Sequence, residues 1–154
     1  FGKVTMYRTC NQQARNCLLY FLNKYFPDTE ALASAIEPLD YNAENPYYKD
    51  LFHSGNYDED YKTLVREIRA YGERIPPLIN SYMRVSPNMR VFGTTLNEHF
   101  GGVEETGILI TIKDMYPDRV GRHMYSLRNF AEKVMLRWWN KDESKNAPCD
   151  QSDG

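Results

Sequence analysis

Residues 89–112, MRVFGTTLNEHFGGVEETGILITI, decide the fold class of this chain. The runs 89–96 and 104–112 predict two strands, and Phe100-Gly101-Gly102 supplies the turn between them. The second run contains an apolar stretch at 108–110 that is too continuous for an exposed sheet edge. We therefore expect an antiparallel pair of strands that lies beside an earlier strand at residues 2–7.

Helices are predicted between and after these strands, because apolar residues recur there at i, i+3 and i+4. Asn11 is expected to cap a helix that ends near residue 26. Asp58 is expected to cap a second helix that ends at Gly72, and the Pro76-Pro77 step is typical of the first turn of a third. The polar residues 28–57 predict a surface excursion with one short helical turn.

This order of elements predicts an α/β chain of the α+β type, in which a small mixed sheet of about three strands packs against helices. A last helix is expected at 117–140, so that residues 1–140 form one domain and 141–154 a polar, disordered tail. A three-stranded sheet has an exposed edge, and the opening residues 1–7 are apolar and strand-like. We therefore expect a fragment of a longer chain, or a tight oligomer.

Composition excludes several classes of function. The net charge of −2 disfavours nucleic-acid binding. The sequence lacks both the roughly 18 consecutive apolar residues of a membrane span and a signal peptide, which predicts a cytoplasmic protein. Its three cysteines, Cys10, Cys17 and Cys149, have no metal-ligand spacing. No metal site is expected, and Cys10 and Cys17 are interpreted as reduced, buried side chains rather than nucleophiles.

Residues 97–105 form the richest polar cluster, with one histidine and three carboxylates at a strand-turn-strand junction. A carboxylate or imidazole here could act as a general base toward an amine. The alternative, which carries equal weight, is that Glu98, Glu104 and Glu105 are solvated turn residues and His99 an incidental neighbour.

Five arginines at positions 66, 69, 74, 84 and 90 are candidates for a local basic patch. An acidic acyl carrier protein would be attracted to such a patch. The alternative, favoured for most of these arginines, is pairing with Glu67, Glu73 and Asp60 on solvated helix faces.

The segment 72–84, GERIPPLINSYMR, resembles the Pro-Pro-Leu-x-x-x-Tyr-x-Arg block of the haemolysin-like N-acyltransferases of the GNAT superfamily. These relatives include enzymes that make ornithine lipids and N-acyl glycine lipids. Residues 89–100 and 103–110 are similar to the continuation of that block, and the likeness runs from residue 1 to about 112. Val85-Ser86-Pro87 departs from the Leu-Gly-Ala of the ornithine-lipid relatives, which favours glycine or another small amino acid as acceptor.

This resemblance implies the C-terminal half of a GNAT acyltransferase fold. In that fold the acyl thioester lies between two splayed strands, of which residues 1–7 would be the second. The donor-binding half would then lie upstream of Phe1, and this chain alone would be inactive. The implied reaction moves a fatty acyl group from acyl carrier protein or coenzyme A to an amino group, with no covalently bound cofactor. Peripheral contact with the inner membrane is a further expectation.

Six residues are predicted to serve this implied reaction. Glu104 or Glu105 is the candidate base or amine ligand, and His99 is the alternative base. Tyr82 and Arg84 are candidates for binding the acceptor carboxylate, with Asn97 as a further substrate-binding residue. Two competing interpretations remain: a noncatalytic docking module and, more distantly, a membrane-lytic protein, which the mixed charge of the last predicted helix disfavours.

Overall fold

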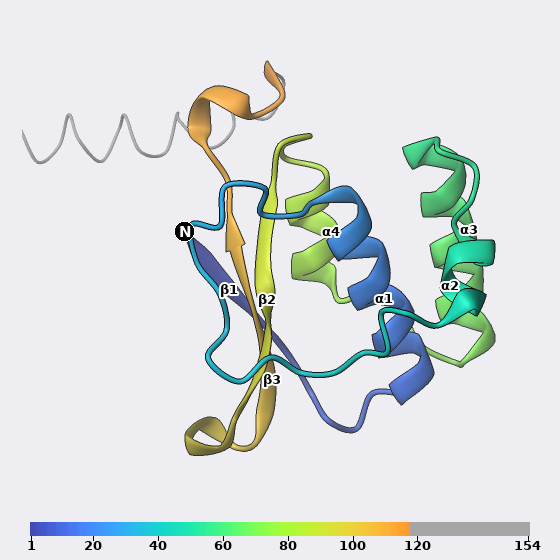
Figure 1. Ribbon diagram of the computed structural model, residues 1–154, viewed down its shortest axis with the longest axis horizontal. Helices are drawn as coiled ribbons and strands as arrows, with labels where there is room; N and C mark the ends of the chain where they lie inside the picture. Colours follow the sequence, from blue (N-terminus) through green and yellow to red (C-terminus); the bar gives the residue numbers. More distant parts are fainter. Residues whose placement is uncertain (118–154) are drawn as a thin grey trace, which may run out of the picture. The chain divides into compact units, whose positions relative to one another are not determined.

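The computed structural model describes residues 1–117, so the helix predicted from residue 117 onward and the tail at 141–154 lie outside the described residues. Residues 1–115 form one compact unit. Its elements are β1 (Gly2–Met6), α1 (Gln12–Tyr25), α2 (Pro46–Leu51), α3 (Tyr57–Ala70), α4 (Pro77–Met83), β2 (Arg90–Asn97) and β3 (Val103–Leu109), with 3-10 turns at Glu98–Phe100 and Ile112–Asp114 (Figure 1).

The sheet has the order β1-β3-β2, and both strand pairs are antiparallel where a mixed sheet was expected. The fold class and the number of strands are confirmed. The central place of β3 also confirms that its apolar run belongs away from the sheet edge. Glu104 lies at the middle of one row across the sheet, between Met6 on β1 and Leu96 on β2.

An irregularity in β2 sets which of its side chains face the helices. The register with β3 shifts between Val91 and Thr94, and Gly93 in this gap has a φ of 94°. Glycine adopts this left-handed backbone at no steric cost, whereas other residues resist it. After the shift, the buried hydroxyls of Thr94 and Thr106 lie 2.7 Å apart across the two strands.

The two edges of the sheet differ. The connection at residues 27–45 runs along β2, where the backbone N–H of Leu39 donates to Thr94 O at 2.7 Å and Thr95 Oγ1 donates to Glu37 O at 2.8 Å. Within residues 1–117 no strand pairs with the outer side of β1. The outward backbone groups of β1 are therefore available to another segment or a ligand.

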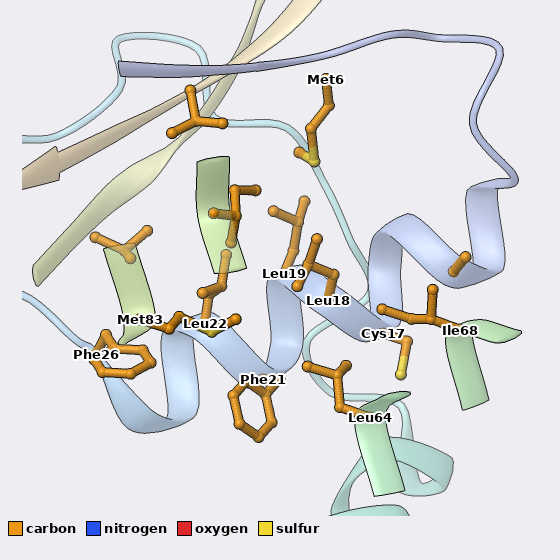
Figure 2. Close-up of a cluster of buried hydrophobic side chains, with 14 of the residues drawn as sticks. Met6, Cys17, Leu18, Leu19, Phe21, Leu22, Phe26, Leu64, Ile68 and Met83 are labelled. Carbon is orange, nitrogen blue, oxygen red and sulfur yellow. The ribbon is translucent and has the colours of Figure 1, made fainter. Parts of the chain in front are cut away.

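The helices pack on one face of the sheet (Figure 1), and α1 lies at the centre of the core. Figure 2 shows its side chains meeting residues from α3 and α4; the labelled residues of this cluster are Met6, Cys17, Leu18, Leu19, Phe21, Leu22, Phe26, Leu64, Ile68 and Met83. Each large apolar side chain buried here contributes about 1.5–3 kcal/mol. Among the helices of residues 1–117, none has the length and apolar character needed to cross a membrane.

The predicted helix starts are confirmed at two helices and corrected at one. Asn11 Oδ1 accepts hydrogen bonds from two backbone N–H groups of the first turn of α1. Pro77 stands in the first turn of α4. The cap of α3 is Asn56 rather than Asp58, because the Asn56 side chain accepts from the backbone N–H groups of Asp58 and Glu59. Asp58 instead adds negative charge to the first turn, where the helix dipole favours it.

A buried carboxylate that the sequence did not reveal joins α1 to α3. Asp60 is 2% exposed and accepts hydrogen bonds from Lys24 Nζ at 2.9 Å, Tyr25 Oη at 2.5 Å and Ser54 Oγ at 2.7 Å. Burial alone would raise the pKa of Asp60, but the bonds from Tyr25, Lys24 and Ser54 outweigh burial and lower that pKa to about 2. Asp60 is therefore ionised in the folded protein.

Candidate functional site

A cleft of about 470 Å³ lies along the outer part of β1. We call it the β1 cleft; it is lined by Lys3, Val4, Thr5, Met6, Tyr7, Thr9, Cys10, Glu73, Arg74, Pro76, Pro77 and Leu78. The cleft therefore combines an open strand edge with the Pro-Pro step that begins α4. Its size lies within the range of small-molecule sites, of about 300–1,000 Å³.

Glu104 is a buried carboxylate on the strand next to β1; it neighbours residues of the β1 cleft but is not itself among those that line it. Its Cα is paired with that of Met6, which lines the cleft, and its charge acts on Cys10, another lining residue. Glu104 Oε1 accepts a hydrogen bond from Arg15 Nη1 at 2.6 Å, and the Glu104 side chain is only 5% exposed. Arg15 is held in turn by Asn16 Oδ1, at 3.0 and 2.8 Å.

The second oxygen of this carboxylate, Glu104 Oε2, is buried and has no hydrogen-bond partner within residues 1–117. Leaving a buried acceptor unpaired costs about 1–3 kcal/mol, so such atoms are rare unless water or a ligand reaches them. A carboxylate that is fixed through one oxygen and unpaired at the other is suited to accept a hydrogen bond from an amine. The sequence analysis did not predict a role for Arg15, which fixes Glu104. A charged residue beside the apolar positions of the first helix was the feature that could have indicated it.

The two described cysteines differ in burial, because Cys17 is buried as expected whereas Cys10 is only half-buried. Burial and then the nearby charges of Glu73 and Glu104 raise the pKa of the half-buried Cys10 thiol. Burial raises the pKa of Cys17 to about 12. Both are free thiols, and a thiol with a raised pKa supplies little thiolate at neutral pH.

Glu105 lies on the opposite face of the sheet from Glu104, because successive side chains of a strand alternate. Lys3 Nζ donates to Glu105 Oε1 at 2.7 Å, and Asn97 Nδ2 donates to Glu105 Oε2 at 3.1 Å. The bonds from Lys3 and then Asn97 lower the pKa of Glu105, which makes its carboxylate a weaker base. Of the predicted site residues, the structure thus brings Glu105 and Asn97 together, away from Glu104.

The remaining predicted residues lie apart from one another. His99 is exposed in the 3-10 turn between β2 and β3. Tyr82 lines a cavity of about 120 Å³ beside Gly2 and Ile108, whereas Arg84 is exposed and lines a different cavity beside Tyr61. Tyr82 and Arg84 therefore do not converge on one carboxylate within residues 1–117.

The arginines also correct an expectation. Arg90 pairs with Asp28 at 3.6 Å and Glu30 at 2.6 Å. The other four, at positions 66, 69, 74 and 84, form no ion pair within residues 1–117, so the favoured pairing with Glu67, Glu73 and Asp60 is wrong. The acids have other partners: Glu67 accepts from the Tyr47 hydroxyl, Glu73 Oε1 accepts from the Asn11 backbone N–H at 2.8 Å, and Asp60 binds Lys24.

In the part of the chain that the structure describes, no group of three or more histidine, cysteine, aspartate or glutamate side chains is arranged to hold a metal ion.

Comparison with known proteins identifies similar acyltransferases. The chain is 46% identical over 126 residues to the glycine N(alpha)-acyltransferase of Phocaeicola vulgatus. These 126 residues make up 82% of this chain and 39% of that protein. It is 48% identical over 124 residues to the glycine N(alpha)-acyltransferase of Bacteroides thetaiotaomicron, and this alignment covers 80% of this chain and 37% of that protein. The chain thus spans less than half the length of these curated relatives. No family model and no solved structure matches it.

Proposed function

We propose that this chain is the acceptor side of an N-acyltransferase that moves an acyl group from a thioester to the amino group of glycine or another small amino acid. The observation that carries the proposal is the buried Glu104 carboxylate, held by Arg15 through one oxygen and unpartnered at the other, beside the β1 cleft. The similarity to two glycine N(alpha)-acyltransferases supports the same reaction class.

In the proposed reaction, Glu104 Oε2 accepts a hydrogen bond from the neutral amino group of the acceptor. It takes one of the two N–H protons as the nitrogen attacks the thioester carbonyl carbon, and the new C–N bond gives a tetrahedral intermediate. Collapse of this intermediate expels the thiolate and leaves an amide. The outward N–H groups of β1 are suited to stabilise the oxyanion, since preorganised backbone donors do this without reorganisation. Arg15 keeps the carboxylate oriented throughout.

The proposal extends to the partners of this half. The haemolysin-like branch of the GNAT superfamily, with residues 1–140 as the C-terminal part of its domain, is the family that we propose. A donor-binding segment would lie against the open edge of β1 and present acyl carrier protein or coenzyme A thioester to the cleft. We further propose a cytoplasmic location with peripheral contact to the inner membrane.

A chimera tests the proposal directly. Residues 1–117 replace the aligned segment of the Phocaeicola vulgatus relative, and N-acyl glycine is measured by mass spectrometry after incubation with glycine and an acyl thioester. We expect the chimera to form the product. Glu104→Gln in the chimera should lower kcat by about 10²-fold or more, the usual contribution of a general base.

Glu105→Gln in the same chimera is the matched control, because Glu105 is the neighbouring carboxylate on the other face of the sheet. It should retain turnover within about threefold, since a surface ion pair contributes only about 0–1 kcal/mol. Equal activity of the chimera and its Glu104→Gln variant would remove the proposed base. A folded chimera without activity would instead favour the noncatalytic docking module.

A further inference from the structure

We propose that a second cavity, next to the α3–α4 connection, binds a phosphate group. This arginine cavity has a volume of about 350 Å³ and is lined by Tyr61, Val65, Ile68, Arg69, Arg74, Ile75, Asn80 and Arg84. Its lining comes from α3, from α4 and from the connection between them. The sequence had placed these arginines in one patch but had not predicted a cavity.

Among the residues that the structure describes, three guanidinium groups line this cavity and no acidic side chain does. Arg69, Arg74 and Arg84 are all exposed, and none forms an ion pair within residues 1–117. Like charges in one concave site repel one another, and this repulsion is relieved when an anion binds. The cavity therefore carries a positive charge that the described part of the chain leaves uncompensated.

The rest of the lining adds polar groups and an apolar wall. Tyr61 Oη donates to Asn80 Oδ1 at 2.6 Å, and Arg84 Nη2 lies 3.5 Å from Tyr61 Oη. This chain of contacts positions Arg84 at one side of the cavity. Val65, Ile68 and Ile75 supply aliphatic surface to the same cavity, which suits the carbon-bearing side of an ester.

The number of arginines favours phosphate over carboxylate. A monocarboxylate, such as that of an amino acid, balances one positive charge, whereas a phosphomonoester carries about two negative charges at neutral pH. Guanidinium groups bind phosphate oxygens in bidentate fashion, which makes arginine the usual residue at phosphate sites. A phosphate ester thus satisfies this lining better than the carboxylate that had been assigned to Arg84.

Calorimetric titration of the 154-residue chain with inorganic pyrophosphate at low salt tests the site. We expect saturable binding that weakens about tenfold in Arg69→Gln and about tenfold in Arg84→Gln, in line with about 1.5 kcal/mol for a hydrogen bond to a charged group. Arg69 and Arg84 line the arginine cavity but not the β1 cleft. Arg66→Gln is the matched control, because Arg66 lies on α3, forms no ion pair and does not line the cavity. It removes the same net charge and should change the affinity less than about twofold.

Sodium acetate in place of pyrophosphate tests the choice of anion, and it should bind at least about tenfold more weakly. Pyrophosphate binding that is absent, or equally weakened by all three substitutions, would overturn the proposal. Tighter binding of acetate would also overturn it. These substitutions are at exposed positions, so the midpoint temperature of thermal unfolding should stay within a few degrees of that of the unsubstituted chain.

Two competition experiments distinguish the sources of the phosphate. Coenzyme A represents a soluble phosphate ester, and vesicles of phosphatidic acid in phosphatidylcholine represent a lipid headgroup. Displacement of pyrophosphate by either one, but not by phosphatidylcholine vesicles alone, supports a phosphate-ester site and identifies its source. Failure of both to displace pyrophosphate would overturn it. No step measures acyl transfer, so the result is independent of the proposed function.

Discussion

At the scale of single residues, the carboxylates of this chain differ by the partners that surround them. Asp60 accepts from three side chains, Glu105 accepts from two, and Glu104 has one ion-pair partner and one unpaired oxygen. A carboxylate whose oxygens all accept hydrogen bonds contributes to the stability of the fold. An unpaired buried oxygen instead lowers that stability, and a ligand that donates a hydrogen bond to it would remove this cost. The adjacent residues Glu104 and Glu105 thus have different surroundings, because successive side chains of a strand point to opposite faces of the sheet.

Replacement of Asp60 tests whether a fully hydrogen-bonded carboxylate stabilises the fold. Asp60→Asn removes the charge that binds Lys24 and weakens the bond from Tyr25, so the free energy of unfolding at pH 7 should fall by on the order of 2 kcal/mol. Urea denaturation followed by circular dichroism measures the change. Lys49→Gln, which breaks an exposed ion pair with Glu44, is the control and should change stability by less than about 0.5 kcal/mol.

The lowered pKa of Asp60 predicts that the stability of the protein depends on pH. Folding lowers the pKa of Asp60 from 3.8 to about 2, so its contribution is present above pH 4 and is lost as pH falls toward 2. Wild-type stability should therefore fall more steeply between pH 4 and pH 2 than that of Asp60→Asn. Parallel slopes in the two proteins would show that Asp60 is not ionised in the way described.

At the scale of elements, α1 depends on its cap. Asn11→Ala leaves two backbone N–H groups of the first turn without an acceptor and should lower the free energy of unfolding by about 1 kcal/mol. Gln12→Ala, at the exposed first residue of the helix, is the control and should be neutral. Equal stability of the two variants would mean that solvent caps the helix as well as Asn11 does.

The bulge in β2 depends on the positive φ of Gly93. A Cβ at Gly93 would meet Ala35 Cβ at an ordinary distance of 3.6 Å, so the cost of Gly93→Ala comes from its positive φ. That cost should be about 1–2 kcal/mol in chemical denaturation. Gly2→Ala, at a glycine without positive φ, has similar space around it and should cost less.

The elements themselves were predictable from the sequence, because apolar periodicity and cap residues act locally. The helices 12–25, 57–70 and 77–83 and all three described strands occur where the pattern placed them. Features that depend on distant partners were not predictable. Asp60 looked solvated because its partners Lys24 and Tyr25 are on another helix. The contacts of Glu104 and Glu105 depend on how β3 pairs with β1 and packs on α1, and the sequence alone does not specify this pairing and packing.

At the scale of the whole molecule, the sheet has one strand that is paired on both sides and one that is open. β3 pairs with β1 and β2, whereas the outer side of β1 has no strand partner within residues 1–117. Amide hydrogen exchange should therefore be slowest in β3 and faster at alternate residues of β1. Uniformly slow exchange across β1 would show that another segment or a second copy covers this edge in solution.

Arg74 lines both the β1 cleft and the arginine cavity. The exposed Arg74 guanidinium is therefore shared by two neighbouring cavities, and a ligand that held it in one of them would change the lining of the other. Thermodynamic linkage requires this influence to be mutual: whatever factor an anion in one cavity applies to binding in the cleft, the occupant of the cleft applies to the anion. Under the two proposals, two binding equilibria would share a single side chain on the connection between α3 and α4.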